Sequence, residues 1–181
     1  AGTAEVSYYD RNTGNTQSVS AELVTTGMTA LGEGSGDTNP KWYVVKESVT
    51  INNRITVTGN VHLILADNAI LTAEKGIDVS AGNSFTIYAE NAVGTGMLTA
   101  KSEDRYAGIG GSENKAGGTI TITGGKVIAS SEESGAGIGG GLEGAGGTIT
   151  ITGGTVTASS GISGAGIGSG GDGKGGTIRI K

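Results

Sequence analysis

The chain has 181 residues, with 37 glycines, one proline, no cysteine and a formal net charge of −5. This length suits a single domain with a continuous core, and the absence of cysteine excludes disulfides and thiolate chemistry. The acidic balance argues against a nucleic-acid partner, and no apolar run approaches the roughly 20 residues that cross a bilayer. We therefore expect neither nucleic-acid binding nor membrane insertion.

Residues 1–40 do not share the pattern of the later chain. Short alternating runs at 6–9 and 18–26 predict strands, and the segment 32–40 has the composition of a linker. Because the remaining residues predict a solenoid, whose first coil must be covered, we interpret 1–40 as an N-terminal cap. Residues 41–181 then form the solenoid itself.

The solenoid begins with degenerate coils. Trp42-Tyr43-Val44-Val45 starts the first, and residues 59–68 align with 82–91 at a spacing of 82 − 59 = 23. This alignment puts Val61, Leu63 and Leu65 on the face where later coils carry threonine. We expect the N-terminal segment to cover that face.

A fixed period organises the second half. Ala-Gly-Ile-Gly-Gly at 107–111 returns at 136–140 and, as Ala-Gly-Ile-Gly, at 165–168, so that 136 − 107 = 29 and 165 − 136 = 29. Thr-Ile-Thr-Ile-Thr at 119–123 returns at 148–152. It alternates polar and β-branched apolar residues with period 2, which predicts a strand with one buried face.

Short strands separated by glycine corners and repeated every 29 residues predict an all-β fold, a right-handed parallel β-helix of about five to six coils. Equivalent residues should stack in interior columns. The predicted columns are Ile120, Ile149 and Ile178; Ile122, Ile151 and Ile180; Val127 and Val156; Ala129 and Ala158; and Ile77, Ile109, Ile138 and Ile167. The last coil has no evident cap, which predicts a fragment of a longer protein or end-to-end self-association.

Carboxylates recur in the turn after the second strand of two neighbouring coils. Glu103 and Asp104 align with Glu132 and Glu133, since 103 + 29 = 132. Stacked carboxylates repel one another, and Ca²⁺ with oxygen ligands would relieve that repulsion. These four residues are therefore a candidate calcium site, with a solvated acidic turn as the alternative. A second column, Asn114, Glu143 and Asp172, leaves the same two interpretations open.

Sugar-binding proteins usually stack the apolar face of a sugar ring on an exposed aromatic side chain. Aromatic residues are scarce in this chain, so few candidates for such a platform exist. Tyr88 takes the outward position that threonine holds in later coils, and Tyr106 flanks Arg105 on the same coil. We predict a ligand platform of Tyr88, Arg105 and Tyr106. Trp42 is a further candidate, although we favour a place for it in the cap. The outward threonines also suggest ice binding, but exposed β-faces favour threonine in any case.

A resemblance to a known family is carried by Trp42-Tyr43-Val44-Val45, by residues 57–67 and by the two repeated phrases. These resemble the β-helical modules of large secreted or wall-attached proteins of gut-type Firmicutes. The resemblance implies an extracellular, non-catalytic module for adhesion or glycan binding. It supplies no catalytic residues.

We therefore predict a non-catalytic carbohydrate-binding module, secreted or at a bacterial surface, with a polysaccharide or glycan as partner and calcium as the one cofactor considered. A structural stalk without a ligand is one alternative. A polysaccharide lyase or glycoside hydrolase is another, but it needs clustered carboxylates, and the best aligned pair is Asp67 and Glu90. His62 stands alone, which makes a zinc site improbable.

Overall fold

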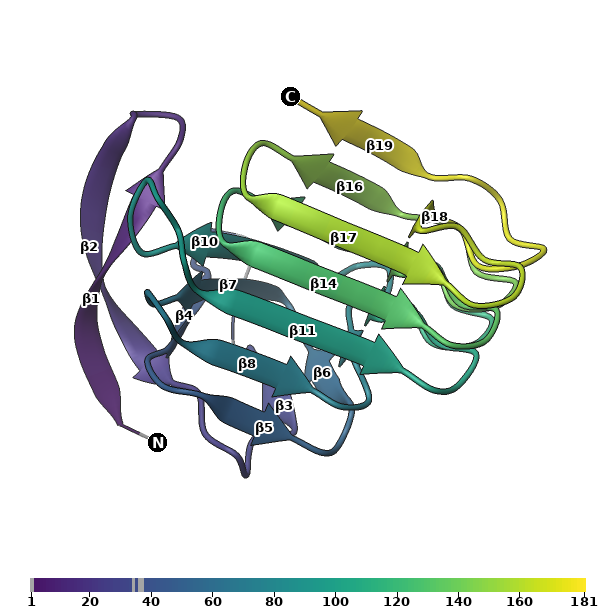
Figure 1. Cartoon of the computed structure of the whole chain (residues 1–181), viewed down its shortest axis with the longest axis horizontal. Coiled ribbons are helices and arrows are strands. Elements are labelled where there is room, and N and C mark those ends of the chain that lie inside the picture. Colours follow the sequence, from purple (N-terminus) through teal and green to yellow (C-terminus); the bar gives the residue numbers. More distant parts are fainter. Residues whose placement is uncertain (1, 34, 36–37) are drawn as a thin grey trace.

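The computed structural model describes residues 2–33, 35 and 38–181, whose strands wind into a parallel β-helix with three sheets (Figure 1). The eight-stranded sheet contains, in spatial order, β1 (Thr3–Asp10), β2 (Asn15–Leu23), β4 (Lys41–Val45), β7 (Asn60–Leu65), β10 (Ser84–Ala89), β13 (Thr119–Ile122), β16 (Thr148–Ile151) and β19 (Thr177–Ile180). The five-stranded sheet contains β5 (Val49–Ile51), β8 (Ile70–Ala73), β11 (Met97–Ser102), β14 (Lys126–Ser131) and β17 (Thr155–Ser160). The six-stranded sheet contains β3 (Ala30–Leu31), β6 (Ile55–Val57), β9 (Ile77–Asp78), β12 (Ile109–Gly110), β15 (Ile138–Gly139) and β18 (Ile167–Gly168).

Each coil takes one strand from each sheet in turn. The described residues form five complete coils, β4–β5–β6 through β16–β18, and β19 begins another. From β4 onward every pairing within the three sheets is parallel, which confirms the predicted parallel β-helix. Among the residues that the structure describes, no helix is long and apolar enough to cross a membrane.

The predicted interior columns are confirmed by the register. Ile120 pairs with Ile149 and Ile149 with Ile178, while Ile109 pairs with Ile138. The columns that begin at Ile120 and Ile122 are buried as far as β16, whereas in β19 Ile178 is 42% exposed and Ile180 70%. Burial of these branched side chains supplies the main favourable term for folding.

The alignment of the early coils is wrong by one residue. Val61 pairs with Phe85, so the true spacing is 85 − 61 = 24 rather than 23. Because strand side chains alternate between faces, a slip of one residue turns each side chain to the other face. Val61, Leu63 and Leu65 therefore point inward and are buried, and the outward positions belong to His62 and Ile64.

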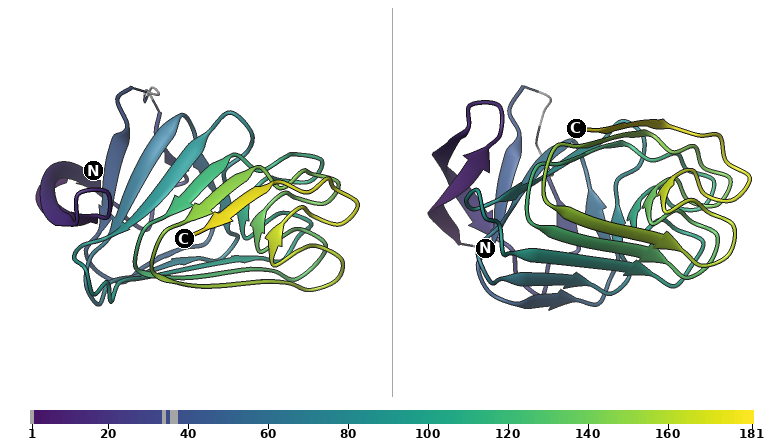
Figure 2. Two further views of the ribbon diagram at one scale, coloured as in Figure 1. Left: turned by 90° about the horizontal axis from the view of Figure 1, so that it is seen from above. Right: turned by 45° about the horizontal axis from the view of Figure 1, so that its top comes forward.

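The N-terminal hairpin covers these outward positions. β1 and β2 pair antiparallel, and the end of β2 pairs parallel with β4 through Glu22 and Tyr43. From there the hairpin lies beside the later strands of the same sheet, where β1 contacts β10 (Figure 2). Ile64, which this sheet turns outward, is consequently buried. The N-terminal segment therefore covers the outer face of β7, as we expected. The residues that it covers are His62 and Ile64 rather than Val61, Leu63 and Leu65.

The Ala-Gly-Ile-Gly-Gly phrase has a backbone reason. Gly110, Gly139 and Gly168 have φ angles of 140°, 136° and 141°, which side-chain-bearing residues rarely adopt. A Cβ atom on Gly110 would also collide with the carbonyl oxygen of Gly139 one coil away. The repeated glycines thus let adjacent coils approach closely at this corner.

Candidate functional site

The outer face of the eight-stranded sheet presents threonines in register. Thr86 pairs with Thr121, Thr121 with Thr150, and Thr150 with Arg179. Two residues further along their strands come Tyr88, Thr123, Thr152 and Lys181. Alternation points both columns outward, because the intervening isoleucines fill the core.

The hairpin turn forms a wall over this face. The Arg11 Nε donates a hydrogen bond to the carbonyl oxygen of Thr123, which links the turn to the residue that follows β13. Between hairpin and sheet is a cavity of about 320 Å³, which we name the threonine groove. It is lined by Asp10, Arg11, Asn12, Thr86, Tyr88, Thr121, Thr123, Thr150, Thr152 and Lys181.

The hydroxyl groups of the groove differ in their bonding. Thr123 Oγ1 donates to the carbonyl oxygen of Ile87 at 3.0 Å. The hydroxyls of Thr121 and Thr150 have no hydrogen-bond partner among the described residues, and both side chains are half-buried. A hydroxyl both donates and accepts, so these two can bind either kind of polar group on a ligand.

Tyr88 forms the inner end of the groove. Its ring lies 5.0 Å from that of Tyr8 and 5.1 Å from that of Trp42, and burial raises its pKa to about 12. Trp42 also packs against His62, at 4.5 Å, and burial lowers the pKa of that imidazole to about 4. Trp42, on β4, thus packs against Tyr8 of the hairpin in an aromatic cluster, while Tyr88 also lines the groove.

Arg105 and Tyr106 lie elsewhere, in a second cavity of about 240 Å³ at the turn that follows β11. The Arg105 guanidinium contacts Glu113 Oε1 at 3.0 Å and Glu133 Oε2 at 3.6 Å. One face of Tyr106 lies against the Arg54 guanidinium, 5.0 Å from the ring centroid. The structure therefore brings Arg105 and Tyr106 together but puts Tyr88 in a different site.

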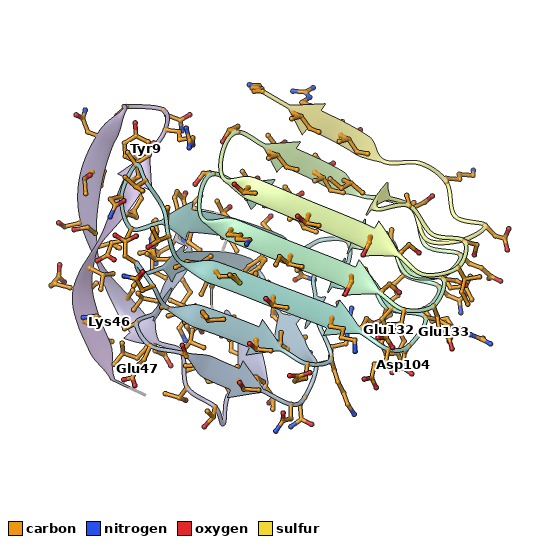
Figure 3. All side chains as sticks on the ribbon, viewed as in Figure 1. Tyr9, Lys46, Glu47, Asp104, Glu132 and Glu133 are labelled. Carbon is orange, nitrogen blue, oxygen red and sulfur yellow. The ribbon has the colours of Figure 1, made fainter. Side chains whose placement is uncertain are left out.

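Asp104, Glu132 and Glu133 of the candidate calcium site lie at this same edge, far from Tyr9 of the hairpin (Figure 3). Lys101 Nζ lies 2.7 Å from Glu132 Oε1 and 3.7 Å from Glu103 Oε1, so this lysine offsets the repulsion between these two glutamates. Across the described residues, no group of three or more His, Cys, Asp or Glu could hold a metal ion. Calcium binding remains a prediction to which this geometry adds no support.

The second polar column has a conformational role. Asn114, Glu143 and Asp172 have φ angles of 61°, 60° and 59°. Asn and Asp tolerate this left-handed conformation better than other side-chain-bearing residues, which accounts for their recurrence at the corner.

Asp67 and Glu90 are also explained by local structure. The Asp67 backbone N–H donates to Glu90 Oε2 at 2.7 Å, and the Asp67 carboxylate accepts hydrogen bonds from Asn91 and Thr95. Both carboxylates therefore serve to fix a corner.

Arg54 is a structurally important residue that sequence patterns do not reveal. Its guanidinium donates to the carbonyl oxygens of Lys75 at 3.0 Å, Ala107 at 2.9 Å and Gly110 at 3.2 Å, and burial lowers its pKa to about 10. Arg54 lies before the 29-residue repeats, and no equivalent arginine recurs in them, so the repeated pattern does not identify it.

Comparison with known proteins supports the repeat. Residues 120–142 and 149–171 each match a family model described as "Beta helix repeat", and each match spans one coil, β13–β15 and β16–β18. The chain therefore contains β-helix repeats. No curated protein and no solved structure matched it.

Proposed function

We propose that this β-helix binds an extended polysaccharide in the threonine groove without cleaving it. One observation carries the proposal: a walled cavity of about 320 Å³ whose floor presents the unpaired hydroxyls of Thr121 and Thr150 in register. That volume lies at the lower end of the roughly 300–1,000 Å³ typical of small-molecule sites.

The chemistry of the lining supports a sugar ligand. Sugars present rings of hydroxyls around an apolar C–H face, and therefore need hydrogen-bonding groups together with an aromatic or methyl surface. Threonine supplies a hydroxyl and a methyl group at each position, and the exposed part of Tyr88 supplies the ring. Because parallel strands repeat about every 4.8 Å, the same groups recur along the solenoid, which suits a repeating polymer. A secreted or surface-attached protein, the setting implied by the family resemblance, would meet such polymers.

The test removes hydroxyls without removing volume. The double variant Thr121→Val/Thr150→Val should weaken binding of a polysaccharide found by array screening about tenfold, because two hydrogen bonds are lost at roughly 0.5–1.5 kcal/mol each. Thr72→Val/Thr99→Val is the matched control, since these threonines pair in register on the outer face of the five-stranded sheet. Equal loss in both variants would count against the groove. No ligand across a broad array would leave the stalk as the better interpretation.

The non-catalytic part of the proposal has its own test. The groove lining contains one carboxylate, Asp10, whereas glycoside hydrolysis ordinarily uses two. Prolonged incubation with bound polysaccharides, in Ca²⁺ and separately in EDTA, should produce neither new reducing ends nor unsaturated products. Either product would favour the enzyme alternative.

A further inference from the structure

Positive charge gathers around the threonine groove in a chain whose formal net charge is −5. Arg11 extends from the hairpin turn, Lys181 lines the groove, and Arg179 continues the outward column of Thr121 and Thr150. Asp10 is the one carboxylate of the lining, and its Oδ1 already accepts a hydrogen bond from the Asn12 backbone N–H at 2.9 Å.

These three cations are not neutralised by the protein. None of the ion pairs between described residues includes Arg11, Arg179 or Lys181, and the side chains of all three are exposed. The contrast is with Lys101 and Arg105 at the acidic edge, each of which contacts two glutamates. The groove thus presents cations that no carboxylate of the described residues pairs with, unlike the cations of the acidic edge.

We infer that the ligand of the threonine groove is an anionic polysaccharide, one that carries carboxylate or sulfate groups along its chain. This inference rests on the proposed function and specifies its ligand class. Guanidinium and ammonium groups bind such oxyanions through charge-assisted hydrogen bonds, and arginine can bind them in a bidentate manner. The threonine hydroxyls between the cations bind the sugar hydroxyls.

The first experiment compares polymers that share a backbone and differ in charge. Binding of the full chain is measured by isothermal titration calorimetry to dextran sulfate against dextran, and to alginate oligosaccharides against their methyl esters. At least one anionic polymer should bind at least tenfold more tightly than its neutral partner. That preference should shrink about tenfold between 50 and 500 mM NaCl, because salt screens exposed charges. Preference for the sulfated pair alone or the carboxylated pair alone supports the inference and identifies the anion.

The second experiment locates the effect. Arg179→Gln/Lys181→Gln should weaken anionic binding roughly fivefold to tenfold, as expected for two exposed ion pairs. Lys126→Gln/Lys174→Gln removes the same charge from exposed residues outside the groove and should change binding less than twofold. Equal losses in the two variants would overturn the inference. Equally tight binding of neutral and anionic polymers would overturn it while leaving the proposed function intact, whereas no binding to any polysaccharide would overturn the proposed function itself.

Discussion

Two features of the structure at Gly139 exclude a side chain at this position. The φ of 136° is strained for any side-chain-bearing residue, and a Cβ would collide with the carbonyl oxygen of Gly168. We expect Gly139→Ala to lower the free energy of unfolding by about 2–4 kcal/mol, measured by urea denaturation. Gly175→Ala is the control, because Gly175 has no neighbour within 4 Å of the added carbon and no positive φ. Equal effects of the two substitutions would contradict this explanation.

Glu143 holds a conformation that suits asparagine better. Its φ of 60° matches the 61° of Asn114 at the equivalent corner, and Glu143 is exposed. Glu143→Asn should therefore raise the free energy of unfolding by about 0.5 kcal/mol, because asparagine is less strained in the left-handed region. Glu143→Gln removes the charge without relieving the backbone, and should leave stability nearly unchanged. A gain from glutamine equal to that from asparagine would assign the effect to charge.

At the scale of the element, the hairpin depends on the aromatic cluster of Tyr8, Trp42, His62 and Tyr88. Tyr8 alone belongs to the hairpin, and it contacts Trp42 at 4.6 Å and Tyr88 at 5.0 Å. Such ring pairs contribute roughly 0.5–1.5 kcal/mol beyond their buried area. The aromatic cluster therefore adds to the β2–β4 pairing and to the Arg11–Thr123 hydrogen bond in holding the hairpin beside the groove.

The pH dependence of stability should reflect His62 in this cluster. Burial lowers its pKa from 6.5 to about 4, so the unfolded state binds a proton more readily than the folded state. The contribution of neutral His62 is present above pH 6.5 and is lost as the pH falls toward 4, by about 1–2 kcal/mol after allowance for partial solvation. Urea denaturation of the native chain and of His62→Phe at pH 7.5, 5.5 and 4.5 checks this. If both proteins lose equal stability on acidification, His62 is not responsible.

At the scale of the whole molecule, Arg54 connects coils that are far apart in sequence. It lies between β5 and β6, and its acceptors belong to the next two coils, including the carbonyl oxygens of Lys75 and Gly110. Arg54→Met should lower the free energy of unfolding by about 3 kcal/mol, because several carbonyls would lose their donor. Arg54→Lys should recover only part of the loss, since an ammonium group cannot reproduce the planar set of donors. Full recovery by lysine would show that charge alone matters.

Much of the fold was predictable from sequence because its cause is local and repeated. The isoleucine columns followed directly from alternation within a fixed period, and the register confirms them. The error at Val61 arose where the period changes, since no repeat there fixes the spacing to 24 rather than 23. A single residue then decides which face is buried.

The candidate site was less predictable, because it depends on how separate elements pack. Alternation gave the outward direction of Tyr88, but no sequence pattern placed Arg11 of the hairpin on Thr123. Tyr106 and Tyr88 lie on one coil yet at different sites, since a coil passes through all three sheets.

The constant period of the last coils has a consequence for growth of the molecule. Ile149 follows Ile120 by 29 residues, and Ile178 follows Ile149 by the same number, with identical outward threonines on the first two rungs. Duplication of residues 119–147 would therefore insert one further rung and move everything after it about 4.8 Å along the axis. Gene duplication in units of 29 codons could thus lengthen the track for a polymer in even steps, without redesign of the core.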